Sequence, residues 1–140
     1  MAIHSQSLVV IGILLLALVT VESGGVFLTR VVRGGVPANT LQKSFFRAGH
    51  AHAAVLLVLS VVILSVVDSA KLSGAWDVIA RYGVPAAAIL MPAGFFLSVI
   101  GRDPAGPNRL VVLLWAGVGC VTAGLIVAGI GILAAGLAAF

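Results

Sequence analysis

Charge is scarce in this 140-residue chain, and that scarcity decides its broad class. Charged residues make up 9% of the sequence, whereas hydrophobic residues make up 61%. A soluble domain carries about a quarter charged residues, so this chain lacks the polar surface that keeps a folded protein in water. A lipid bilayer tolerates such a surface. The composition therefore predicts an integral membrane protein.

The sequence also lacks the short segments of alternating apolar and polar residues that a membrane β-barrel shows. Its apolar runs are long and continuous, and a helix can satisfy its own backbone hydrogen bonds in lipid. Four runs reach the roughly 20 residues needed to cross a bilayer. We expect an all-α integral membrane four-helix bundle with antiparallel up-down topology. It would form a single transmembrane domain over residues 1–140, with spans at about 8–32, 45–67, 78–100 and 110–136.

Several kinds of chemistry are missing as well. Cys120 is the one cysteine, so the chain has neither a disulfide framework nor a C-x-x-C redox pair. It has no phosphate-binding loop and no recognisable Ser-His-Asp arrangement. These absences favour a protein that is not an enzyme. The formal charge of +4 does not indicate nucleic acid, because the basic residues stand at span ends, where they contact lipid head groups.

The basic residues are distributed unevenly between the two ends of the predicted bundle. One end, formed by the first and third connections, has six of them, and the opposite end has two, which stand beside Asp68 and Asp77. The six are Arg30, Arg33, Lys43, Arg47, Arg102 and Arg109, and the two are Lys71 and Arg81. Because Lys and Arg mark cytoplasmic loops, we expect the basic loops in the cytoplasm and both termini outside. The expected location is a bacterial inner membrane.

A few polar residues interrupt the apolar spans, and they gather in the predicted cytoplasmic leaflet. Glu22 lies within the first span, and His50 and His52 lie near the start of the second. Arg47, Asn108 and Arg109 are candidate charge partners in the same layer. A carboxylate within the membrane faces the bundle and finds a partner, and such a residue indicates a functional site by default. A polar clamp between helices is the structural alternative.

The spacing of the two histidines limits a metal site. Residues two apart on a helix point about 200° away from each other, so His50 and His52 cannot easily bind one ion together. The metal candidates are therefore Glu22 with one of the two histidines. A bis-histidine haem would need a second copy of the chain, because His4 lies at the opposite surface. The cofactor stays unknown.

The second span carries a resemblance to a known family. The run Arg47-Ala48-Gly49-His50 is similar to the one that opens the second helix of the membrane-associated eicosanoid and glutathione transferases. Those proteins also have four helices and a basic loop between the first two. The resemblance implies a thiol-conjugating activity. The polar Asn and Glu that follow the histidine in that family correspond here to Ala and Leu residues.

Small residues recur on the fourth span at four-residue spacing, namely Ala116, Cys120, Gly124 and Ala128. Small residues let membrane helices approach closely, so this face predicts either packing inside the bundle or a contact with another subunit. Our first functional hypothesis is a Glu22/His cluster that binds a proton, a metal ion or a small polar ligand. The alternatives are a structural or accessory subunit of a larger membrane complex, such as a respiratory one, and an oligomeric transporter or thiol-transferase-like enzyme.

Overall fold

Four long helices make up almost all of the structure, a computed structural model that describes residues 3–140. They are α1 (Ser5–Val32), α2 (Thr40–Val66), α3 (Gly74–Ser98) and α4 (Val112–Leu137). Short 3₁₀ helices, η1 (Val67–Ala70) and η2 (Arg109–Val111), extend α2 and precede α4. The described residues contain no strand, and all four helices are long and apolar enough to cross a membrane. The expectation of an all-α protein with four apolar helices is confirmed.

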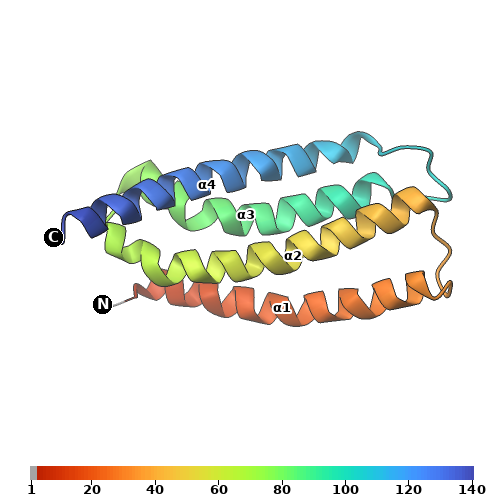
Figure 1. The fold of residues 1–140 in the computed structure, drawn as a ribbon, viewed down its shortest axis with the longest axis horizontal. Helices are drawn as coiled ribbons and strands as arrows, with labels where there is room; N and C mark the ends of the chain where they lie inside the picture. Colours follow the sequence, from red (N-terminus) through yellow and green to blue (C-terminus); the bar gives the residue numbers. More distant parts are fainter. Residues whose placement is uncertain (1–2) are drawn as a thin grey trace.

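The helices pack mainly in chain order. α1 lies against α2, α2 against α3 and α3 against α4, with the last pair in the closest contact. The chain reverses direction at each connection, so the start of α1 and the end of α4 lie at the same end of the molecule (Figure 1). α1 and α4 form opposite edges of this view (Figure 1). The bundle is therefore open, and much of α1 and of α4 has no protein neighbour.

Recognised capping motifs end α1 and begin α2. Gly34 has a positive φ of 78°, and the N–H groups of Gly34 and Gly35 donate to the carbonyls of Val31 and Arg30. This is the Schellman arrangement, in which a glycine accepts the left-handed conformation. Asn39 caps α2 in a reciprocal capping box with Gln42.

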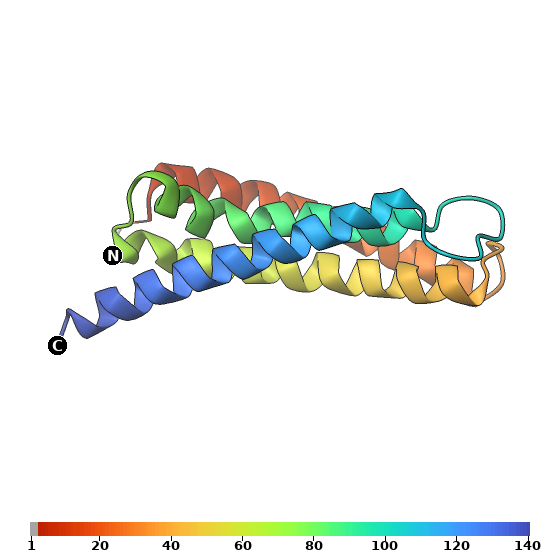
Figure 2. The same ribbon diagram turned by 90° about the horizontal axis from the view of Figure 1, so that it is seen from above.

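The α1–α2 and α3–α4 connections lie at the same end of the molecule (Figure 2), and side chains tie them together. The side-chain amide of Asn39 donates to the Asp103 carboxylate at 2.8 Å and to the Pro104 carbonyl at 2.9 Å. The side-chain amide of Gln42 donates to the carbonyls of Val99 and Gly101 at 3.0 and 3.1 Å. Residues that cap α2 thus also hold the α3–α4 connection in place.

Glycines bring α3 and α4 into near backbone contact. Gly83 of α3 lies against Gly124 of α4 so closely that a Cβ on Gly83 would come within 2.8 Å of the Gly124 Cα. Gly117, Gly124, Ala128 and Gly131 are all buried. Much of the small-residue face of α4 is therefore used inside the chain. Of the four residues that suggested a subunit contact there, only Ala116 is exposed.

Candidate functional site

Glu22 lies ten residues before the end of α1, and its side chain is exposed. No hydrogen bond or ion pair joins it to any residue that the structure describes. Neighbouring hydroxyls on α1 differ in this respect, because each donates to a carbonyl of its own helix. Thr20 donates to Ala17, Ser23 to Thr20 and Thr29 to Gly25. Among the polar side chains from Thr20 to Thr29, Glu22 is the one that forms no hydrogen bond within the described structure.

His50 is wedged against two glycines of α1. A Cβ on Gly24 would lie 3.1 Å from the His50 Nδ1, and one on Gly25 would lie 3.7 Å from its ring. The Gly24-Gly25 pair therefore forms a notch that admits the imidazole between α1 and α2. The ring is partly buried, and no hydrogen bond to it is formed within residues 3–140.

His52 points away from this notch, as the two-residue spacing predicts. Its Nδ1 lies 2.8 Å from the Ala48 carbonyl of its own helix, and its ring packs on Phe95 with the centroids 5.0 Å apart. It belongs to a layer of aromatic rings that joins α1, α2 and α3. The layer comprises Phe27, Phe45, Phe46, Phe95 and Phe96. His52 therefore has a packing role here, separate from that of His50.

The three candidate charge partners do not converge on Glu22 either. Arg47 donates from Nε to the Lys43 carbonyl one turn back, toward the connection. Asn108 closes the α3–α4 turn, because its side chain accepts from the Leu110 N–H and donates to the Leu97 carbonyl. Arg109 is exposed on η2.

The predicted residues thus share one half of the molecule without forming one polar cluster. Glu22 bonds to neither histidine. Within residues 3–140, no three His, Cys, Asp or Glu side chains are close enough together to hold a metal ion. A metal site at Glu22 or His50 would need ligands beyond those that the described residues bring together there.

The structure contains a buried ionic cluster at the other end, where the sequence indicated only surface charge. Arg81 of α3 is 2% exposed. Its guanidinium donates to the Asp77 carboxylate at 2.7 Å, to the Asp68 carboxylate at 2.8 Å and to the Ser7 hydroxyl. Asp68 also accepts from the backbone N–H of His4 at 2.8 Å and from the Ser7 hydroxyl at 2.9 Å.

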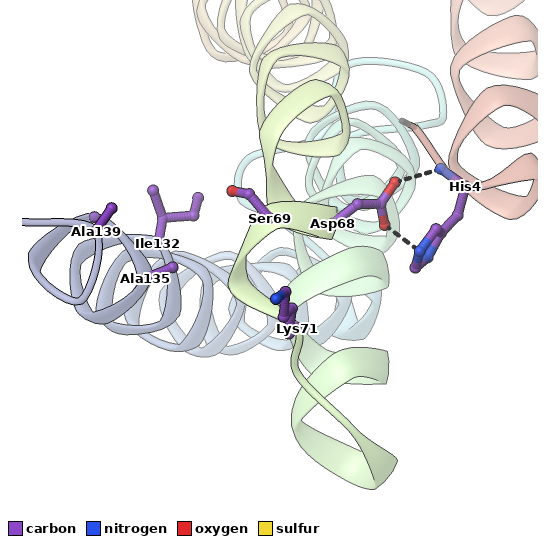
Figure 3. A pocket seen from close by; sticks show the side chains of 8 residues that line it. His4, Asp68, Ser69, Lys71, Ile132, Ala135 and Ala139 are labelled. Carbon is purple, nitrogen blue, oxygen red and sulfur yellow. Dashed lines mark hydrogen bonds and ion pairs between the residues drawn. The ribbon is translucent and has the colours of Figure 1, made fainter. Parts of the chain in front are cut away.

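This Arg81 cluster ties the start of α1 to η1 and α3. Figure 3 shows the Asp68 carboxylate turned toward His4, whose imidazole Nδ1 lies 3.3 Å from it. The i, i+4 spacing of Asp77 and Arg81 was a usable signal, but nothing in the sequence places Ser7 or Asp68 beside them. Every buried side-chain nitrogen and oxygen of the cluster has a hydrogen-bond partner, as expected of a structural clamp. Beside it, a cavity of about 720 Å³ opens between η1 and the last turns of α4 (Figure 3).

No known protein family, curated protein or solved structure matches this chain. The resemblance of Arg47-Ala48-Gly49-His50 to the membrane-associated transferases therefore stays a prediction.

Proposed function

We propose that this chain is a subunit of a larger membrane assembly and that the outward face of α1 contacts the neighbouring subunit. The observation that carries the proposal is the exposed, unbonded carboxylate of Glu22. At 1.5 Å per residue, Glu22 stands roughly 15 Å from the end of α1, close to the midplane of a hydrocarbon core about 30 Å thick. A charged side chain costs about 3 kcal/mol or more at that depth when it faces lipid.

A protein neighbour with a matching donor removes that cost. α1 is suited to such a contact, because it packs mainly on α2 and leaves one side open over its whole length. The exposed residues of this side include Val19, Glu22, Ser23 and Val26, which recur at helical spacing. We propose that the protein lies in a bacterial inner membrane. The end that carries six basic residues would face the cytoplasm, and both termini would lie outside.

Cross-linking in native membranes tests the proposal. In a Cys120→Ala background, Val19→Cys and Val26→Cys place a thiol about one turn on either side of Glu22. We expect both to cross-link to a neighbouring protein or to a second copy. Ile89→Cys is the matched control, because Ile89 is likewise exposed, at 70%, but belongs to α3. Equal cross-linking at Ile89, or none at Val19 and Val26, contradicts the proposal.

Substitution of Glu22 gives an independent measurement. Glu22→Gln should lower the fraction of the chain that is extracted in the assembly by mild detergent, because the carboxylate no longer pairs with its partner. Ser23→Ala, on the same face, should leave this fraction unchanged, since the Ser23 hydroxyl is already bonded to Thr20. If Glu22→Gln leaves this fraction as high as Ser23→Ala does, the assembly does not depend on the Glu22 carboxylate.

A second candidate function is a proton, metal or small-polar-ligand site at Glu22 and His50. The observation in its favour is the His50 imidazole, which sits in the Gly24-Gly25 notch with no hydrogen bond within the described chain. Such a site would be completed by the neighbouring subunit. Elemental analysis of the assembly extracted from membranes, compared with that of the Glu22→Gln variant, distinguishes this candidate from a purely structural contact. Bound metal that Glu22→Gln removes would support it.

A further inference from the structure

A small cavity lies between the C-terminal end of α1 and the first turns of α2. Its volume is about 190 Å³, and its lining has two chemically distinct sides. Leu28, Val31 and Val32 of α1 form an apolar wall, and Lys43 and Arg47 of α2 form a basic rim. The cavity stands at the end of the molecule that carries six of the eight basic residues.

The rim carries two cations that no residue of the described chain neutralises. Arg47 donates from Nε to the Lys43 carbonyl at 3.2 Å, which folds its side chain back toward Lys43 and leaves the terminal guanidinium nitrogens without a protein acceptor. None of the ion pairs formed within residues 3–140 includes Lys43 or Arg47. Asp103, the acidic side chain of the α3–α4 connection at this end, accepts instead from Asn39.

The position of these two cations is unfavourable for the helix itself. Like charges four residues apart repel each other on a helix surface. The N-terminus of α2 is also the positive end of its macrodipole, and its first turn contains no acidic residue. A bound anion would relieve the repulsion between these two cations, because both side chains would attract it.

We propose that this cavity binds a phosphate group, carried by an anionic lipid of the cytoplasmic leaflet or free in solution. Lys43 and Arg47 contact the phosphate, and the Leu28-Val31-Val32 wall contacts the glycerol and acyl portion when the phosphate belongs to a lipid. Basic pockets between membrane helices hold acidic head groups by this combination of charge and apolar surface.

Ligand-induced thermal stabilisation of the purified full-length protein in neutral detergent tests the site. The probes are dioctanoyl phosphatidylglycerol, dioctanoyl phosphatidylcholine and inorganic phosphate. We expect phosphatidylglycerol to raise the unfolding midpoint in a saturable manner and phosphatidylcholine to leave it unchanged. Stabilisation by phosphatidylglycerol alone identifies the lipid as the source of the phosphate, whereas equal stabilisation by inorganic phosphate identifies the free anion.

Two matched variants complete the test. Arg47→Gln should weaken the Kd about tenfold or more, because a charge-assisted hydrogen bond is lost. Arg102→Gln removes the same charge from an exposed position in the other connection at this end, and it should keep the wild-type Kd. Lys43→Gln should weaken binding like Arg47→Gln. Absence of stabilisation by either anionic probe, equal stabilisation by phosphatidylcholine, or equal losses in Arg47→Gln and Arg102→Gln overturns the proposal.

Discussion

Arg81 and Glu22 are ionisable residues on long apolar helices, yet their surroundings are opposite. Arg81 is enclosed by two carboxylates and a hydroxyl, whereas Glu22 faces outward with no bond inside the chain. From the sequence alone, Glu22 would be expected to be the buried residue, because it stands in the middle of an apolar run. Arg81 would be expected to be the exposed one, because it stands near a span end. Burial depends on the neighbouring helix, and a single sequence does not show which neighbour each side chain meets.

At this residue scale, Arg81→Met should destabilise the protein strongly. The substitution leaves Asp68 with its side chain 5% exposed and without its cationic partner, and breaking a buried ion pair in this way costs about 3–5 kcal/mol. The measurement is the midpoint of thermal or denaturant unfolding in detergent.

Lys71→Met is the matched control, because Lys71 is an exposed cation close to the same cluster and forms no ion pair within the described residues. Its unfolding midpoint should stay near that of the wild type. Equal midpoints for Arg81→Met and Lys71→Met would show that the Arg81 cluster is not a stabilising clamp.

At the scale of the helices, close approach of α3 to α4 depends on glycine. Gly83→Ala puts a methyl group within 2.8 Å of both the Cys120 carbonyl oxygen and the Gly124 Cα. Because these are backbone atoms, they cannot rotate aside, and the helices must separate. Overpacking of this kind costs about 1–3 kcal/mol. We expect a lower unfolding midpoint for Gly83→Ala.

A Gly→Ala substitution on α4 that faces away from α3 should not lower the unfolding midpoint. A Cβ on Gly129 meets nothing within 4 Å, and alanine is the better helix former by about 1 kcal/mol. Gly129→Ala should therefore leave the unfolding midpoint unchanged or raise it slightly. A decrease as large as that of Gly83→Ala would mean that the α3–α4 contact is not the reason for the effect.

At the scale of the whole molecule, the α1–α2 and α3–α4 connections share one end with six of the eight basic residues, and the start of α1 and the end of α4 share the other (Figure 1). The basic end should face the cytoplasm. In a Cys120→Ala background, Ala105→Cys lies in the α3–α4 connection and Ser73→Cys just before α3, and both positions are exposed. A membrane-impermeant maleimide applied to intact cells should label Ser73→Cys and spare Ala105→Cys. The reverse pattern would invert the orientation.

Composition and run length determined the four helices of this protein without further information. Each helix satisfies its own backbone, so about 20 consecutive apolar residues are enough to specify it. Local motifs determined the turns in the same way: Gly34 allows the left-handed end of α1, and Asn39 caps α2. These features depend on residues that are close in the chain.

Only the tertiary structure decided which polar residues meet. Ser7 and Arg81 are 74 positions apart, and their contact exists because α1 and α3 lie side by side at one end. Glu22 and His50 stand at similar depths, yet Gly24 and Gly25 turn the face of α1 beside Glu22 toward α2 and leave the carboxylate outside. The rotation of each helix about its own axis is set by packing against its neighbours, and the apolar runs of the sequence do not record it.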